Sequence, residues 1–470
     1  MAKIVVLGAG ISGLASAALL AQAGHEVTVL ERNQWLGGKS RRIEVAGQRM
    51  DTGPALVTFP EVWQEFLDLF DRLGPNKHSD LVDLQFEKLN EVGRYFFRNH
   101  VTDLPVKKNH HWHKPWQRFV KQHSALTPAI SKLLTASPLN PTTLPAVLKM
   151  AKVYGKNLTT DKYIESLRWM PRGLKEVIAI HTLNAGISPK KTLALYASMT
   201  AAMATEGISV PLGGVNEIPL AIAKLAKAAG ATIQLGERVT SVKKGRVTTE
   251  TSQYQADYVV SSLDPEVLGP LMGKPARHKT QRSCSGVAIY AVLKSPLPEG
   301  TVTHSVVMPD EPQQLYAALE NFVPPKQTMA FVNYYRAGQI YPNSKPTVAV
   351  LLTAPADGKH YDLQSDWVKA EVVRISKKLG LKKPITDLFE EHVILDPEYF
   401  GSWGAFNGAL YGATRPLWQS GPFHSPQHHN PLKPWLYRVG ASVHPGGGIP
   451  AVLGGSLISM RKLLARASKK

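Results

Sequence analysis

Glycines stand where a first strand is expected to end and a helix to begin. Gly8, Gly10 and Gly13 follow a short apolar run and open a segment rich in alanine and leucine. The next apolar run ends in an acid, Glu31. This order is typical of a dinucleotide-binding βαβ unit, in which glycines let backbone N–H groups approach a pyrophosphate and the acid accepts hydrogen bonds from a ribose. The full context favours such a site over an ordinary glycine turn.

A second glycine turn with cations follows within a few residues. Gly37 and Gly38 precede Lys39 and Arg41, and Arg32 directly follows the acid. A nicotinamide site has no need of this second turn. A flavin site needs such a turn, because the longer FAD cofactor extends past the first loop. There, backbone atoms at close range and a cation can contact its phosphates and ring system. The sequence therefore predicts FAD rather than NAD, and the alternative is a solvated basic turn.

The last glycine-rich run, VGASVHPGGGIPAVLGGS at 439–456, again separates an expected strand from an expected helix. Pro450 stands in the first turn of that helix, a position that proline favours. A helix N-terminus with bare backbone N–H groups binds anions. We therefore expect the last helix to complete the pocket of the first loop from the other side, in a discontinuous domain that brings both chain ends together.

The middle of the chain indicates further elements of two lobes. The stretch 211–235, PLGGVNEIPLAIAKLAKAAGATIQL, predicts an amphipathic helix and then a strand. Later runs such as GVAIYAVL and TVAVLLTA favour a mostly antiparallel sheet in a second lobe. Between about Pro75 and Pro211 the pattern is weaker.

The segment HHWHKPWQRFVKQH, residues 110–123, mixes basic residues with aromatic ones. Its Trp112, Trp116 and Phe119 beside cations are typical of a patch on a membrane surface. Three histidines also permit a metal site, but no carboxylate or cysteine stands beside them at a ligand spacing, so we predict no metal. A plain exposed loop would fit the same composition.

The composition indicates an ordered protein with an anionic partner. The chain has 470 residues, of which 43% are hydrophobic, and its single cysteine, Cys284, cannot form an internal disulfide, which fits a reducing compartment. The formal net charge of +19 attracts acidic lipid headgroups or nucleic acid. No nucleic-acid-binding signature is visible, so we predict no nucleic-acid partner. No apolar window indicates a spanning helix, and we expect a cytoplasmic protein that associates peripherally with an acidic membrane surface.

Together these motifs resemble the phytoene desaturase family of carotenoid enzymes, within the flavin-dependent amine-oxidase-like superfamily. The similar stretches are GAGISGLASAALLAQAGHEVTVLE, GGKS, MDTGPA, PLGGVNEIPLAIAKLAKAAGATIQLGERVTSV, VVSSLDP and LYRVGASVHPGGGIPAV, about half of the chain. The resemblance implies an α/β protein with a discontinuous Rossmann-type, glutathione-reductase-like FAD-binding domain. It also implies an α+β substrate domain that carries a mostly antiparallel sheet.

The resemblance further implies which residues hold FAD. It places the pyrophosphate at Gly8, Gly10 and Gly13, the adenosine ribose at Glu31, and the adenine at Val239. Ile11 and Ser12 also bind the cofactor. Lys39 and Arg41 lie near the phosphates or the flavin, and Arg32 and Gly38 belong to the same site. The pyrophosphate, ribityl chain and isoalloxazine edge also meet Gly440, Ala441, Gly448 and Ile449.

We expect the two domains to alternate along the chain. The predicted segments are 1–75, 211–270 and 426–470 for the FAD-binding domain, 76–210 for a helical, membrane-facing substrate region, and 271–425 for the sheet of the substrate domain.

The activity that the resemblance implies is desaturation of a long polyene, phytoene-like or partly desaturated. A hydride passes to flavin N5, a proton is lost, and an electron acceptor, oxygen or a membrane quinone, reoxidises the flavin. The aromatic residues Trp403, Phe406 and Tyr411 and also His444 stand in or before the C-terminal flavin segment. We assign none of them as an acid or base, and the catalytic side chains stay unknown.

Several rival functions remain open from the sequence. The same family pattern serves carotenoid isomerases, saturases and oxygenating enzymes. Lys39 stands where arginine is commoner, Leu212 replaces a frequent arginine, and Ser442-Val443 replaces a small pair, which argues against copying one subfamily's substrate. A soluble amine or porphyrinogen oxidase and a non-catalytic escort for a lipid or lipidated protein are the rivals outside the carotenoid enzymes.

Overall fold

Five parallel strands from distant parts of the chain form one sheet. The computed structural model describes residues 1–53, 55–138, 140–276, 281–402, 406–419 and 423–468. The strands stand in the order β19 (Leu436–Arg438), β13 (Tyr258–Ser261), β1 (Lys3–Leu7), β2 (Glu26–Glu31) and β9 (Thr232–Leu235). All four neighbouring pairs are parallel. The two chain ends and a middle segment therefore share one sheet, as the sequence predicted.

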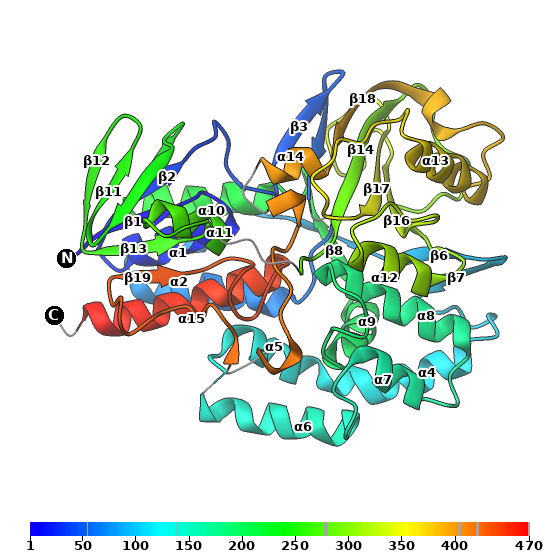
Figure 1. Ribbon diagram of the computed structural model, residues 1–470, viewed down its shortest axis with the longest axis horizontal. Coiled ribbons are helices and arrows are strands. Elements are labelled where there is room, and N and C mark those ends of the chain that lie inside the picture. Colours follow the sequence, from blue (N-terminus) through cyan, green and yellow to red (C-terminus); the bar gives the residue numbers. More distant parts are fainter. Residues whose placement is uncertain (54, 139, 277–280, 403–405, 420–422, 469–470) are drawn as a thin grey trace.

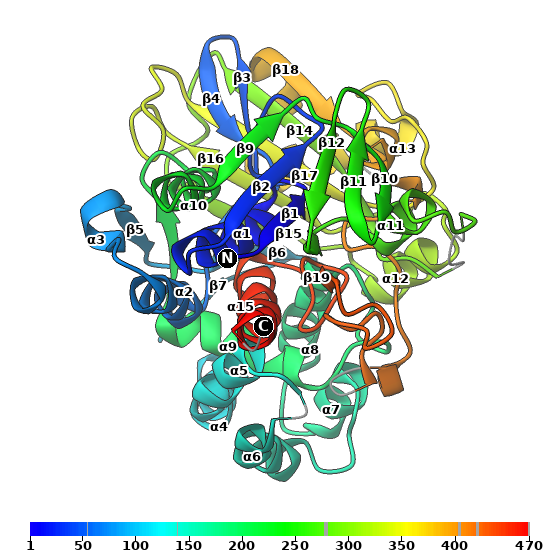
Figure 2. The same cartoon turned by 90° about the vertical axis from the view of Figure 1, so that its left-hand side faces the viewer.

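Small residues let three helices pack closely on one face of this sheet. α1 (Ile11–Gln22) is buried over its whole length, and it packs against α10 (Glu217–Ala228) and α15 (Ile449–Ala467). The opposite face carries α11 (Pro265–Leu271) and a three-stranded antiparallel sheet. Its strands are β10 (Val239–Lys243), β11 (Gly245–Thr249) and β12 (Gln253–Ala256). The marked chain ends lie close together in both views (Figures 1 and 2).

A seven-stranded sheet forms the other lobe and is antiparallel at every pairing except one. The strands stand in the order β18 (Phe389–Leu395), β14 (Ser285–Leu293), β17 (Thr347–Ala354), β16 (Ala330–Tyr335), β15 (His304–Val307), β6 (Gly93–Phe97) and β7 (His100–Leu104). Only β15 and β6 pair in parallel. The mostly antiparallel sheet is thus confirmed. Two of its strands, β6 and β7, come from the segment that we expected to be helical, because they are short and their sequences carry weak apolar patterning.

The lobe at the bottom of Figure 1 consists mainly of helices within the described residues. They are α4 (His113–His123), α5 (Thr127–Thr135), α6 (Leu144–Tyr154), α7 (Thr160–Ser166), α8 (Arg172–Ile180) and α9 (Leu195–Glu206). The remaining elements are β3 (Arg42–Val45), β4 (Gln48–Asp51), α2 (Pro60–Leu73), α3 (His78–Leu81), β5 (Phe86–Leu89), β8 (Ile208–Pro211), α12 (Pro312–Glu320), α13 (Asp366–Lys378) and α14 (Pro397–Gly401). No described helix combines the length and apolarity that crossing a bilayer requires.

The aromatic residues of 110–123 are core residues, so the prediction that they anchor the protein at a membrane surface is wrong. Trp112 is 4% exposed, Trp116 is 3% exposed and Phe119 is fully buried. Trp116 and Phe119 lie on the inner face of α4 and Trp112 directly precedes the helix. The exposed residues of α4 are Lys114, Gln117, Arg118, Lys121 and Gln122. A sequence that alternates aromatic and basic residues fits an amphipathic core helix as well as a membrane patch.

A buried polar cluster joins four helices of this lobe. His123 Nδ1 lies 2.6 Å from Ser198 Oγ, and its Nε2 lies 2.8 Å from the Tyr163 hydroxyl. The Tyr154 hydroxyl also hydrogen-bonds Ser198. Burial lowers the pKa of His123 to about 3, so the imidazole is neutral in the folded protein. The cluster therefore fixes α4, α6, α7 and α9 relative to one another.

We predict that this cluster destabilises the protein in acid. The unfolded chain protonates His123 below about pH 6.5, while the folded protein does not. As the pH is lowered below this value, the free energy of unfolding therefore falls by about 1.4 kcal/mol per pH unit from this group. In urea unfolding between pH 6 and 4, His123→Gln should remove that slope. Ser198→Ala, the control, should lower stability at every pH and keep the slope. An unchanged slope in His123→Gln would contradict the assignment.

Candidate functional site

The two N-terminal glycine turns pack directly on each other. The Gly37 N–H donates to the Ala9 carbonyl at 2.9 Å, and Gly10 and Gly37 form an isolated parallel bridge. A Cβ atom on Gly38 would lie 3.2 Å from the Cα of Gly10. The second turn is thus the continuation of the first loop in space, which is where a cofactor longer than a pyrophosphate would extend.

Some glycines of the site are crowded and others face open space. A Cβ on Gly13 would lie 2.0 Å from the Gly8 carbonyl oxygen, so Gly13 serves helix–loop packing. A Cβ on Gly10 or on Gly448 would meet no described atom within 4 Å. These two residues precede α1 and α15, and within the described chain neither helix start has a side-chain cap. Bare N–H groups beside open space are suited to hold an anion.

Glu31 is buried at the end of β2 and holds the first loop. Its Oε2 accepts a hydrogen bond from the Ala9 N–H at 2.8 Å, and its Oε1 accepts one from the Asn33 N–H at 3.0 Å. The Asn33 side-chain amide also donates to Oε1, at 2.7 Å, so Oε2, which accepts one hydrogen bond, retains capacity for a ribose hydroxyl. The Glu31 carbonyl accepts from the Glu237 N–H at 2.8 Å, which brings the strand of Val239 to this end of the site.

Lys39 connects the second turn to the C-terminal half of the chain. Its ammonium donates to the Leu410 carbonyl. Burial lowers the pKa of Lys39, against the opposing pull of the Asp264 carboxylate, although the side chain keeps accessible surface. Asp264 in turn accepts a hydrogen bond from Ser442 Oγ at 2.9 Å.

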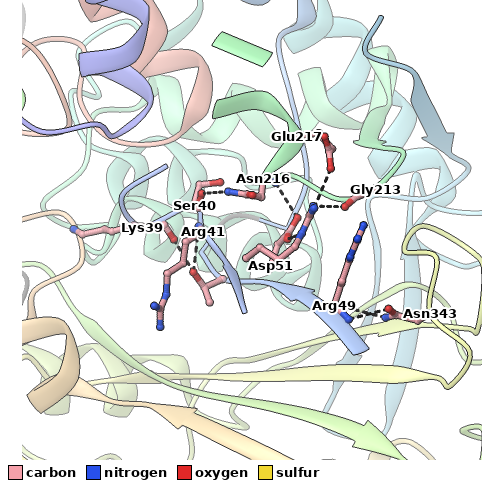
Figure 3. Close-up of polar contacts among 11 residues, drawn as sticks. Lys39, Ser40, Arg41, Arg49, Asp51, Gly213, Asn216, Glu217 and Asn343 are labelled. Carbon is pink, nitrogen blue, oxygen red and sulfur yellow. Dashed lines mark hydrogen bonds and ion pairs between the residues drawn. The ribbon is translucent and has the colours of Figure 1, made fainter. Parts of the chain in front are cut away.

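A charged cluster behind the second turn fixes its position (Figure 3). The Arg42 guanidinium forms ion pairs with Asp51 and Glu217, each at 3.0 Å. Asn216 donates through its side chain to the Ser40 carbonyl at 2.8 Å and through its N–H to Asp51 at 2.8 Å. Our sequence analysis missed this cluster, because its two halves, Arg42 with Asp51 and Asn216 with Glu217, lie more than 160 positions apart.

Arg41 and Arg32 contact other residues of the protein. The Arg41 guanidinium lies 4.5 Å from the ring centroid of Trp35 and 5.5 Å from that of Tyr399. Arg32 donates to the Ser402 carbonyl at 2.7 Å. Their assignment to the cofactor therefore stays a prediction.

The C-terminal glycine run lies against the first loop, as its predicted role requires. The Val439 N–H donates to the Ser261 carbonyl at 3.0 Å, and a Cβ on Gly440 would lie 3.8 Å from Ser12 Oγ. Ser456 of α15 donates to the Ser12 carbonyl at 3.2 Å. Ala441 follows Gly440 in this run, and Ile449 is buried in the first turn of α15.

Tyr411 lies between two glycines of different lobes. A Cβ on Gly447 would lie 2.5 Å from its ring, and a Cβ on Gly186 would lie 2.8 Å from it. His444 contacts the helical lobe instead, with Nε2 3.3 Å from the Leu133 carbonyl oxygen. Burial lowers the pKa of His444 to about 4, so it is neutral at physiological pH. Phe406 faces Arg282 at 4.3 Å, and Trp403 lies outside the described residues.

Within the described residues, one group of metal-ligand side chains gathers, and it consists of His360, Asp396 and Glu398. Asp396 is already occupied, because it accepts hydrogen bonds from the Tyr361 and Tyr399 N–H groups. The group lies in the seven-stranded lobe and is not part of the glycine site.

Residues 11–451 match the sequence model of the flavin containing amine oxidoreductase family. The chain belongs to this family. It is therefore a flavin-dependent oxidoreductase, and the predicted flavin is confirmed at this level.

Relatives of known activity agree with the resemblance to phytoene desaturases. A zeta-carotene-forming phytoene desaturase of Myxococcus xanthus is 27% identical, covering 99% of this chain and 94% of its own length. A 1-hydroxycarotenoid 3,4-desaturase of Flavobacterium sp. is 25% identical, covering 96% of this chain and 97% of its own. The resemblance stated from the sequence is thus confirmed.

Solved structures share the fold at low sequence identity. A triple mutant of putrescine oxidase superposes with a TM-score of 0.67 at 13% identity, covering 100% of this chain and 99% of its own. A cyclohexylamine oxidase from Brevibacterium oxydans gives 0.63 at 14% identity, with the same coverage. These structures confirm the predicted fold class.

We predict that Gly10 and Gly13 fail in different ways when they are replaced. Gly10→Val places its side chain in open space, so thermal unfolding of the flavin-free protein should stay within about 2 °C while bound flavin is lost. Gly13→Val drives a side chain into the Gly8 carbonyl and should lower the yield of folded protein. Gly269→Val, the control, also meets no described atom within 4 Å and should keep its flavin. Flavin retained by Gly10→Val would refute the placement of the first loop.

Proposed function

We propose that the protein binds FAD and desaturates a long carotenoid-type polyene at an acidic membrane surface. The observation that carries this proposal is a pair of uncapped helix starts, at Gly10 and Gly448, on helices α1 and α15 that pack against each other, in a chain whose relatives are carotenoid desaturases along nearly their whole length. We call the two helix starts, at Gly10 and Gly448, the cofactor cradle. They come from opposite ends of the sequence, which suits a cofactor long enough to contact both.

The residues around the cradle fit the parts of FAD. The N–H groups after Gly10 would meet the pyrophosphate, and Glu31 would accept hydrogen bonds from the adenosine ribose. Lys39 supplies a positive charge beyond the second turn, and the start of α15 completes the pocket. When bound, FAD would supply the redox chemistry, as the hydride acceptor of a desaturation in which the substrate also loses a proton.

The chain contributes position and exclusion of water rather than a strong acid or base. The Tyr411 ring is held between Gly186 and Gly447, where the lobes meet, so it can form a wall beside the reacting bond. Burial raises the pKa of Tyr411 far above its usual range, so the phenol stays neutral. The hydride carries two electrons and one proton, and the second hydrogen leaves the substrate as a proton to solvent. Oxygen or a membrane quinone would therefore accept two electrons and two protons in total.

The pigment content of cells tests this proposal. In cells that accumulate phytoene or a partly desaturated carotene, expression of the protein should yield products that are two hydrogens lighter per step and absorb at longer wavelength. Flavin-deficient Gly10→Val is the control and should leave the pigments unchanged. Unchanged mass with shifted absorption would indicate isomerisation instead. A product that has gained hydrogen would indicate saturation, and a product that has gained oxygen would indicate oxygenation. No change in any pigment would contradict a carotenoid substrate.

A further inference from the structure

The outer face of α6 carries an apolar row that faces solvent. Leu144 is 57% exposed, Val147 46% and Leu148 60%, and the exposed Ala151 continues the row by one helical turn. The positions i, i+3, i+4 and i+7 lie on one side of a helix, so these side chains form a continuous stripe. Leu158, 68% exposed, lies just beyond the helix. We call Leu144, Val147, Leu148 and Ala151 the α6 stripe.

The opposite face of α6 is already packed, so the stripe is not the helix's core side. Ala146, Met150 and Tyr154 are each at most 8% exposed. Tyr154 also reaches the buried cluster through its hydrogen bond to Ser198. α6 is thus a helix with two apolar faces, of which the protein buries one. Solvent-exposed apolar rows on a fixed helix mark a contact surface.

Positive charge surrounds the stripe without any acid nearby in the sequence. From residue 104 to residue 160 the chain has nine lysines and arginines and no aspartate or glutamate. Three of these, Lys149, Lys152 and Lys156, lie on α6 or directly after it and are exposed. An apolar stripe flanked by lysines complements an anionic lipid surface, in which apolar side chains enter the acyl boundary and ammonium groups meet headgroups.

The position of α6 suits docking of the whole molecule. α6 is the outermost helix of the lobe in both views, on the side away from the two sheets (Figures 1 and 2). α5 lies between α6 and α15, and a Cβ on Gly454 of α15 would lie 2.0 Å from the Leu134 carbonyl of α5. The stripe and the helix that completes the cofactor cradle are therefore linked through one intervening helix.

We propose that the α6 stripe and Lys149, Lys152 and Lys156 dock the protein on an anionic bilayer. The proposal rests on the proposed function in one respect, that a polyene substrate resides in lipid. It assigns the membrane contact to α6 and not to the buried aromatic residues of α4. Docking through one face leaves the flavin fold unchanged.

Vesicle co-sedimentation tests the proposal. The flavin-loaded protein should bind vesicles of phosphatidylglycerol and phosphatidylcholine, and salt should weaken the binding. Leu144→Ser/Leu148→Ser should reduce the partition coefficient at least about tenfold, because two side chains no longer enter the acyl boundary. Leu148→Ser/Lys152→Gln/Lys156→Gln should abolish binding at moderate salt. Flavin content and thermal unfolding confirm that each variant is folded.

A helix with a comparable exposed face supplies the control. Leu220, Lys224 and Lys227 are exposed on α10. Leu220→Ser/Lys224→Gln/Lys227→Gln removes one leucine and two lysines, as the α6 triple variant does, and should bind vesicles like the unaltered protein. Equal losses in both triple variants would show a nonspecific charge effect and overturn the assignment to α6.

Further outcomes separate docking from the proposed reaction. Wild-type protein that fails to bind the vesicles but desaturates a polyene in detergent would overturn docking and leave the function intact. Binding through α6 without any reaction on polyenes would support docking and contradict the function. A dimer that Leu144→Ser/Leu148→Ser dissociates would show that a second copy covers the stripe, which also overturns the proposal.

Discussion

The backbone N–H groups at the starts of α1 and α15 need acceptors, and this need organises the molecule. Within the described chain neither helix start has a side-chain cap, and open space lies in front of Gly10 and Gly448. Uncapped helix ends cost stability unless a ligand or water satisfies them, and they carry partial positive charge. The proposed FAD would bring an anion to this charge, so the arrangement would favour binding over intrinsic stability.

The folding pattern brings the two helices that begin there, α1 and α15, side by side. The chain ends must lie in one sheet, and β1 and β19 do so with β13 between them. Separate contacts then hold the loops between the strands. On one side, Asp264 accepts a hydrogen bond from Ser442. On the other side, the second turn is held by the ion pairs of Arg42 with Asp51 and Glu217 and by the hydrogen bond from Asn216 to Asp51. Glycines allow the two N-terminal turns to approach each other closely, and the ion pairs of Arg42 hold the second turn in place.

Local motifs made the flavin fold predictable, whereas burial and long-range pairing did not follow from sequence. Gly8, Gly10 and Gly13 between two apolar runs determine a βαβ unit, because spacing alone sets that geometry. The Arg42 cluster depends on residues that meet only after the sheet forms. The aromatic residues of α4 were misassigned because an amphipathic helix can turn its apolar face inward or to a membrane. α6 has apolar residues on two faces, and only the packed structure shows which face is buried and which is exposed.

Anaerobic mixing of the purified flavoprotein with a partly desaturated polyene in detergent tests the central claim most directly. The visible flavin absorbance should bleach, and an equal amount of product, two hydrogens lighter, should form in the same mixing experiment. A flavin that stays oxidised with the polyene, yet is bleached by a primary amine, would contradict it.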